Sequence, residues 1–544
     1  MIKLKKEVSY FIIINQSPQE WRIAMEAIRL WNADLENGTY RNPILHADYS
    51  DPDAIRFGET YYMTASSFNY TPGLPILRSY DLVNWELVNY AIENIDYPDY
   101  KIPQHSKGVW APSIRFHEGC FYIFYGMPDE GIFMVKAKDP LEKWEKPVLV
   151  LEGKGLIDPC PLWDDDGHAY IVHAYAKSRA GFNSVLGVFE MTWDGCRAIS
   201  RDRLVFDGTV TQKTIEGPKL YKRDGWYYIF APAGGVPQGW QTALRSKEIY
   251  GPYEEKIVLR QGDTPVNGPH QGALVDTQGG EEWFLHFQDR GAYGRIIHLQ
   301  PVIWQGGWPV IGRKEEGEDC GKPCLFHKKP ALPETKNVFL RSSDDFSQKE
   351  LALQWQWLGN HEDTFYSLKA RKGYLRLYSQ NPSGQEPALL WNCSNVLTQK
   401  LLCPDFHMDV KMEYAGLDVN EQAGIIVIGQ SYAWLGVARM EGGIRILYVH
   451  ALEDAGGMRE IVKESILMED LRRPIWFRVK VSDGAEVTAK FSFSRDGVNY
   501  QTFPDAFALQ SHTWVGAKTG MFAVAQDCAK HQGYADFAYA KYHA

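Results

Sequence analysis

Three acidic residues open segments that resemble one another, and each stands one or two positions before a proline. They are Asp51 in SDPD, Asp158 in IDPC and Glu216 in IEGPK. Two carboxyl groups with different pKa values can protonate a leaving oxygen and activate a water, which is the chemistry that splits a glycosidic bond. A third carboxylate can raise a neighbour's pKa by like-charge repulsion. Acids also favour turns before strands, so the hypothesis requires that one cavity collects all three.

The three acids belong to a pattern that recurs five times. Each copy has a polar or small entry, alternating apolar residues, a turn and an aromatic strand. The spacing between successive copies is 60, 47, 58 and 54 residues, and the copies begin at Asp51, Ala111, Asp158, Glu216 and His270. Repeats of this length have room for four strands, which is typical of a β-propeller blade. We therefore expect a five-bladed β-propeller in which the residue opening each repeat faces a shared central cavity.

The chain divides into four parts. Residues 1–42 form an N-terminal extension, in which residues 17–36 could make a short amphipathic helix, and residues 43–312 hold the five repeats. Residues 313–338 are charged and contain Pro and Gly without periodicity, so we interpret them as a linker. Residues 339–544 contain short alternating segments separated by turn signals, which predict a β-sandwich. The predicted fold class is all-β, a propeller followed by a sandwich.

Composition excludes several classes of function. The formal charge of −10 argues against nucleic acid or an anionic membrane surface as a partner. We find no apolar run long enough to span a bilayer. The apolar stretch at residues 10–14 is shorter than a signal peptide requires, so we expect a cytoplasmic protein. The 18 Trp, 30 Tyr and 25 Phe residues suit a β-rich core and surfaces that stack on sugars. A homo-oligomer is compatible with this composition.

No metal or cofactor is expected. The eight cysteines are scattered and should be reduced thiols. Cys320, Cys324 and His327 lie close together, but a zinc site would need a fourth ligand at matching spacing. The acidic run at residues 164–166 is better explained as a hairpin turn than as a Ca²⁺ site.

Several longer stretches resemble glycoside hydrolase family 43, in the β-xylosidase and α-L-arabinofuranosidase branch that carries a C-terminal concanavalin-like jelly roll. The resemblance covers residues 40–544 and is specific because many motifs agree at once. It is carried by NPILHADYSDPDAIR, GVWAPSI, GLIDPCPLWDDDGHAYIVH, TIEGPKLYKRDGWYYIFAPAGG and GRIIHLQPVIWQGGWPVIG.

The resemblance implies an exo-acting, inverting glycosidase. By it, Asp51 is the general base, Glu216 the general acid and Asp158 the residue that modulates the pKa of Glu216. The wide separation that inversion needs also suits Asp51 and Glu216, because they open the first and fourth repeats rather than neighbouring ones. The substrate-binding residues implied are Phe68, Trp110, Ile157, His270 and Arg295, with Gln271, Gln238 and Trp240 as weaker candidates for the rim.

The expected substrates are xylo- or arabinoxylo-oligosaccharides, from which the enzyme would release terminal β-1,4-linked xylose, α-L-arabinofuranose or both. Two alternatives stay open: an arabinan-cleaving enzyme of the same fold, and a carbohydrate-binding propeller without catalysis. A retaining sucrose- or fructan-cleaving relative is disfavoured, because its R-D-P and E-C motifs are missing from the sequence.

Overall fold

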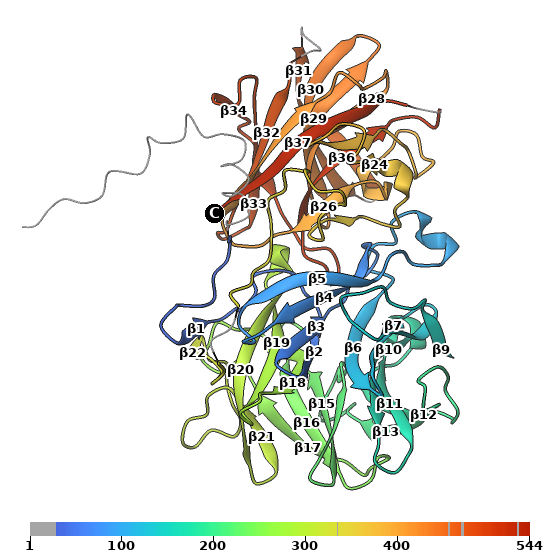
Figure 1. Ribbon diagram of the computed structural model, residues 1–544, viewed down its shortest axis with the longest axis vertical. Coiled ribbons are helices and arrows are strands. Elements are labelled where there is room, and N and C mark those ends of the chain that lie inside the picture. Colours follow the sequence, from blue (N-terminus) through green and yellow to red (C-terminus); the bar gives the residue numbers. More distant parts are fainter. Residues whose placement is uncertain (1–28, 334–335, 455–456, 469–472, 530–531) are drawn as a thin grey trace, which may run out of the picture.

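The computed structural model describes residues 29–333, 336–454, 457–468, 473–529 and 532–544. They form two β-rich bodies, a propeller below and a sandwich above in Figure 1. The predicted fold class is confirmed. Helix is scarce in the described ranges: α2 (Lys177–Ala180) is accompanied by short 3₁₀ segments such as η1 (Pro98–Lys101) and η2 (Gly291–Tyr293). Within those ranges, no helix has the length and apolar character needed to cross a membrane.

The propeller consists of five four-stranded antiparallel sheets, each taken from one continuous stretch of chain. The first two blades contain β2 (Asp53–Phe57), β3 (Thr60–Thr64), β4 (Gly73–Ser79) and β5 (Trp85–Ile92), then β6 (Trp110–His117), β7 (Cys120–Met127), β8 (Gly131–Ala137) and β9 (Val148–Glu152). The third contains β10 (Leu156–Trp163), β11 (Ala169–Tyr175), β12 (Val185–Met191) and β13 (Arg203–Asp207). The last two contain β14 (Lys219–Arg223), β15 (Trp226–Ala233), β16 (Trp240–Ser246) and β17 (Glu254–Leu259), then β18 (His270–Asp276), β19 (Glu282–Asp289), β20 (Arg295–Gln305) and β21 (Trp308–Ile311).

First strands of the blades lie around the propeller axis. β2 contacts β6, β6 contacts β10, β10 contacts β14, and β18 returns to β2. The aromatic second strands follow tight turns and are almost wholly buried, as in β7 and β15. Each inner strand presents its start to the propeller axis. Because side chains alternate between the two faces of a strand, both faces pack against neighbouring blades.

Chain segments outside the blades close the ring. β1 (Thr39–Arg41) pairs with β22 (Phe326–Lys328), which lies in the stretch expected to be a linker. The Asn42 side chain donates to the carbonyl oxygen of Leu299 and accepts from its N–H. Of the amphipathic helix predicted over residues 17–36, residues 29–36 are not helical, and the remainder lies outside the described residues.

The sandwich packs two antiparallel sheets face to face. One has the order β23 (Gln356–Trp357), β26 (Leu397–Lys400), β36 (Lys518–Ala525), β28 (Glu421–Ile428), β29 (Tyr432–Met440), β30 (Gly443–Asp454) and β31 (Gly457–Met468). The other has the order β24 (Tyr366–Ser367), β25 (Leu375–Tyr378), β37 (Tyr534–His543), β27 (Phe406–Glu413), β32 (Ile475–Ser482), β33 (Thr488–Ser494) and β34 (Tyr500–Thr502), with β35 (Phe507–Ala508) beside β33. Strict burial alternation along β27 places one face in the core between the sheets.

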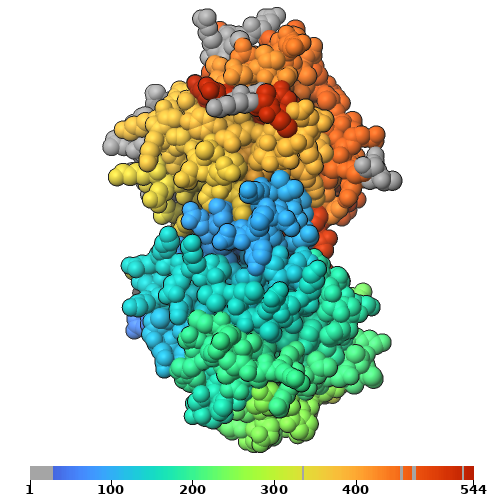
Figure 2. All heavy atoms as spheres, turned by 90° about the vertical axis from the view of Figure 1, so that its right-hand side faces the viewer, coloured from blue at the N-terminus to red at the C-terminus, as the bar shows by residue number. Residues whose placement is uncertain are grey.

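The propeller and the sandwich share a continuous apolar core. It runs from Trp85 and Tyr293 of the propeller to Trp355 and Phe406 of the sandwich. Figure 2 shows residues near the end of the first blade, in blue, directly against yellow residues of the sandwich. There the Ile95 N–H donates to the side chain of Asn360, whose amide donates back to the Ile95 carbonyl. This docking brings a sandwich loop to the mouth of the propeller.

Candidate active site

One small cavity at the propeller axis gathers seven of the eight predicted site residues. It encloses about 70 Å³ and is lined by Asp51, Phe68, Trp110, Ala111, Ile157, Asp158, Glu216, Gln271, Arg295 and Trp514. The eighth, His270, lies behind Glu216 and does not line it. Among the weaker candidates, Gln271 lines the cavity, whereas Gln238 and Trp240 do not.

Backbone conformation identifies the true phase of the five repeats. In each repeat, one residue with left-handed backbone precedes the proline or glycine at the start of the inner strand. These residues are Asp51 (φ 55°), Ala111 (33°), Asp158 (57°), Gly217 (56°) and Gln271 (39°). The predicted starts of the fourth and fifth repeats, Glu216 and His270, therefore come one residue early. The repeats were aligned on a small polar or acidic entry, whereas the fold repeats the turn before the proline or glycine. Glu216 therefore approaches the cavity from a different position than the two aspartates.

Asp51 is held by one cation and two hydroxyl groups. Arg295 Nη1 donates to its Oδ1 at 2.5 Å, while Ser66 Oγ and Ser50 Oγ donate to Oδ2 at 2.6 and 2.9 Å. The Arg295 guanidinium lies over the ring of Phe287 at 4.5 Å and over that of Trp514 at 5.3 Å. The Asp51 side chain is only 7% exposed, so its orientation and its charge balance are fixed by these contacts.

Asp158 is the carboxyl group most disposed to keep a proton. Burial, and then the negative charges of Glu216 and Asp51, raise the pKa of Asp158 to about 8. The Gly217 N–H donates to Asp158 Oδ2 at 2.7 Å and opposes the shift. Because groups this close titrate together, the cavity as a whole retains a proton near neutral pH.

Glu216 differs from the two aspartates in its exposure. Its side chain is 34% exposed, whereas that of Asp51 is nearly covered. His270 Nε2 lies 3.4 Å from Glu216 Oε1, and the imidazole is fully buried with its Nδ1 lacking a hydrogen-bond partner. Glu216 is thus the carboxyl group that solvent, or a departing group, can reach.

Aromatic and aliphatic side chains form the walls. The Phe68 and Trp110 rings meet edge to face, with centroids 6.3 Å apart, and Trp110 Nε1 donates to the Ser106 carbonyl. Trp514 comes from the sandwich and was missed by the sequence analysis. No local pattern marks it, since it reaches the cavity only through the docking of the two domains.

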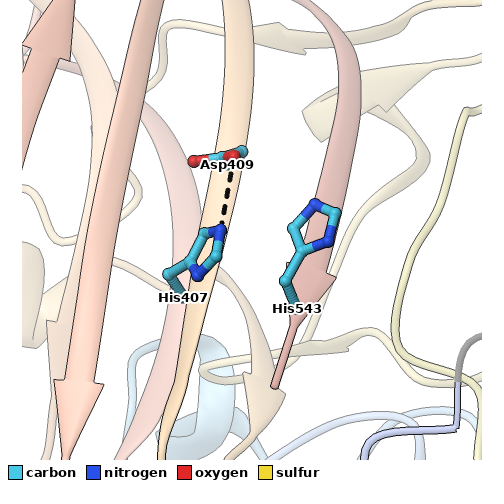
Figure 3. A group of neighbouring side chains, drawn as sticks. All are labelled: His407, Asp409 and His543. Atoms are coloured by element: carbon cyan, nitrogen blue, oxygen red, sulfur yellow. Dashed lines mark ion pairs between the residues drawn. The ribbon is translucent and has the colours of Figure 1, made fainter. Parts of the chain in front are cut away.

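Potential metal ligands lie elsewhere. In the described parts of the chain, the one group of three His, Cys, Asp or Glu donors within 4.8 Å is His407, Asp409 and His543, on adjacent strands of the sandwich (Figure 3). Both Asp409 oxygens accept from Arg478, at 2.6 and 2.8 Å. Burial, and then the charges of Arg478 and Lys480, lower the pKa of the His407 imidazole, while the charge of Asp409 opposes that shift. Because this carboxylate is already paired and the surroundings are cationic, we assign no metal to the group.

Comparisons with known proteins agree with this architecture. The model of the family "Glycosyl hydrolases family 43" matches residues 40–309, and that of the "Beta xylosidase C-terminal Concanavalin A-like domain" matches residues 343–543. A putative beta-xylosidase of Xylanibacter ruminicola is 38% identical, over 90% of this chain and 86% of its own. The non-reducing end alpha-L-arabinofuranosidase BoGH43B of Bacteroides ovatus is 31% identical, over 75% and 77%.

Solved structures show the same two-domain arrangement. The GH43 BlXynB protein from Bacillus licheniformis superposes with a TM-score of 0.79 at 28% identity, covering 93% of this chain and 99% of its own. A bifunctional GH43-CE protein of Bacteroides eggerthii gives a TM-score of 0.79 at 29% identity; the match covers 92% of this chain but 63% of that longer one.

Proposed function

The chain belongs to glycosyl hydrolase family 43 and is a glycoside hydrolase, and on this premise we propose that it releases terminal β-1,4-linked xylose, α-L-arabinofuranose or both from xylan and arabinoxylan oligosaccharides. The observation that carries the proposal is the convergence of three carboxyl groups and one guanidinium in a single small cavity. The names of the relatives supply the sugar class.

We assign the general acid to Glu216, the general base to Asp51 and pKa modulation to Asp158. The exposure of Glu216 suits a group that must meet the leaving oxygen, and the Arg295 contact suits a carboxylate that must stay ionised until it takes a proton. Asp158 lies close enough to Glu216 for their charges to interact, so ionisation of one favours protonation of the other.

The reaction then proceeds as a single displacement. The Glu216 carboxyl group donates its proton to the glycosidic oxygen as the bond from that oxygen to the anomeric carbon breaks. A water attacks the anomeric carbon from the opposite face and gives its proton to Asp51, so the product sugar has inverted configuration. Solvent afterwards returns a proton to Glu216 and removes one from Asp51. The placement of Asp51 and Glu216 in the first and fourth blades, which are not neighbours, supports room for that water.

Action at a chain end is supported by a small cavity that Phe68, Trp110 and Ile157 line beside the three carboxyl groups. It is also supported by the name of one relative, a non-reducing end arabinofuranosidase. Aromatic rings at the wall can pack on the apolar face of the terminal sugar while the carboxyl groups and Arg295 meet its polar groups.

The test is kcat/KM on an aryl β-D-xylopyranoside and an aryl α-L-arabinofuranoside, with NMR of the first-formed anomer. Glu216→Gln should lower kcat/KM on an unactivated disaccharide by about 10²–10⁴-fold. Glu248→Gln, an exposed glutamate on the same blade, is the matched control and should retain activity. Unchanged hydrolysis by Glu216→Gln contradicts the acid role, and activity restricted to arabinan favours the alternative substrate.

A further inference from the structure

Asp48 lies three residues before Asp51 and contacts the main chain of both domains. Its Oδ1 accepts from the Arg295 N–H at 3.0 Å, and its Oδ2 accepts from the Gly516 N–H at 2.9 Å. Arg295 begins β20 of the propeller, whereas Gly516 follows Trp514 in the sandwich loop that leads to β36. Arg295 itself and Trp514, two residues before Gly516, line the cavity described above, and Asp48 is 4% exposed.

The two main chains touch where Asp48 joins them. Gly294 has φ 72°, and a Cβ on it would lie 2.4 Å from Asp48 Oδ1. A Cβ on Gly516 would lie 2.8 Å from the Gly294 Cα. Beside them, the Ala517 N–H donates to the Ala292 carbonyl at 2.7 Å. This close approach makes the position of the Trp514 loop depend on the position of Arg295.

Two lysines lie near the Asp48 carboxylate. Lys518 Nζ lies 3.8 Å from Oδ2, and Lys400 also interacts with Asp48 electrostatically. Burial and the charge of Lys400 lower the pKa of Lys518 to about 7, and Asp48 opposes that shift. The ammonium of Lys518 lies 4.2 Å from the Tyr70 ring centre. A carboxylate here therefore balances charge as well as accepting two main-chain hydrogen bonds.

We propose that Asp48 is a positioning residue of the active site: it fixes Arg295 and the Trp514 loop together, so the sandwich domain helps to orient Asp51. The inference rests on the function proposed above for that site. Through Arg295, Asp48 acts on Asp51 without touching the substrate. Loss of the two hydrogen bonds that Asp48 accepts would free the start of β20 and the Trp514 loop. The Arg295 guanidinium would then leave its place between Phe287 and Trp514.

The first test needs no substrate. Asp48→Asn keeps the shape of the side chain but offers a single carbonyl oxygen to the two N–H donors of Arg295 and Gly516. Its NH₂ group faces the donor that the oxygen does not accept from. Hydrogen exchange followed by mass spectrometry should show exchange faster by about tenfold or more in peptides covering residues 292–296 and 513–518. Lys518→Met keeps both acceptors and should retain protection there. Unchanged exchange in Asp48→Asn overturns the proposal, whatever the enzyme cleaves.

The second test separates positioning from a general loss of structure. Arg295→Gln and Asp48→Asn/Arg295→Gln should differ in kcat/KM by no more than about twofold, because Asp48 acts through Arg295. Multiplicative losses contradict the proposal.

If Asp48→Asn folds poorly, the double variant Asp48→Asn/Lys518→Met serves as the second measurement. It removes the carboxylate together with the buried lysine whose charge that carboxylate balances. We expect it to regain thermal stability while exchange in the two peptides stays fast. Recovery of protection in the double variant would assign Asp48 to charge balance alone and overturn the positioning role.

Discussion

The Gly217 N–H donates to the Oδ2 atom of Asp158 at 2.7 Å, so the residue that follows Glu216 is fixed by the carboxyl group that opens the third blade. The contact links two blades through one main-chain hydrogen bond. It also places the Glu216 and Asp158 carboxyl groups near enough for their charges to interact. The two carboxyl groups therefore come from adjacent blades that this main-chain contact joins.

Asp158→Asn should change how stability depends on pH. The pKa of Asp158 is about 8 in the folded protein and near 3.8 when unfolded, so between these values the folded state binds the extra proton. Stability of the wild type should fall as pH rises from about 4 to about 8, relative to Asp158→Asn, which cannot ionise. Each pKa unit corresponds to about 1.4 kcal/mol, so the total is on the order of several kcal/mol. Tm of both proteins across this range measures it, and a constant difference would contradict the raised pKa.

Gly217→Ala should lower the activity of the enzyme without unfolding it. A Cβ at this position would lie 2.6 Å from Gln271 Cδ and would also strain the backbone at φ 56°. Gly225→Ala is the matched control, since its φ is 70° and the nearest atom, Lys247 Nζ, is 3.8 Å away. We expect kcat/KM to fall at least about tenfold for Gly217→Ala relative to Gly225→Ala, with similar loss of Tm in both. Equal activity of the two variants would show that the Gln271 contact is unimportant.

Ser66→Ala should weaken the assigned base. The Ser66 hydroxyl donates to Asp51 Oδ2 at 2.6 Å and accepts from the Ala111 N–H at 2.7 Å, so the change removes a donor from the carboxylate and orphans a buried N–H. We expect kcat/KM to fall by about tenfold, because the Asp51 carboxylate loses a hydrogen bond that orients it. Unchanged kcat/KM in Ser66→Ala would contradict this role of Ser66.

Trp514→Ala should reveal whether the sandwich domain shapes the sugar cavity. The ring covers Arg295 and lines the wall while remaining 44% exposed, so its removal leaves the core intact. We expect kcat/KM to fall by about tenfold, the loss expected for one aromatic and cation contact. Trp193→Ala, at a ring that is 38% exposed on the third blade, is the control and should keep wild-type kinetics.

The sequence could predict what is local and repeated. Alternating apolar residues and the recurrent turn before each inner strand were enough to infer five blades, and the acids at those turns pointed to one axial cavity. The starts of the fourth and fifth repeats were placed one residue early, because residue types do not report the backbone angle that repeats. His270 was therefore expected in the cavity, where Gln271 lies instead.

Contacts between domains could not be predicted in this way. Trp514 and Gly516 stand in a loop whose sequence shows no relation to the repeats. Trp514 lies beside Arg295, and Gly516 lies against Gly294, only where the two domains pack together. The role of Asp48 could not be predicted from the sequence either, because its two partners are main-chain N–H groups, which nearly any residue supplies. The catalytic roles of Asp51, Asp158 and Glu216 stay predictions until they are measured.

The way the ring closes has a mechanical consequence. In the part of the chain that the structure describes, each blade is built from one continuous stretch, so the first and fifth blades do not share a sheet. Instead, Leu45 and Ile297 exchange main-chain hydrogen bonds, and the Asn42 side chain makes two hydrogen bonds to the main chain of Leu299. If the N-terminal segment were pulled, we expect the first and fifth blades to separate from each other before the strands within any blade separate.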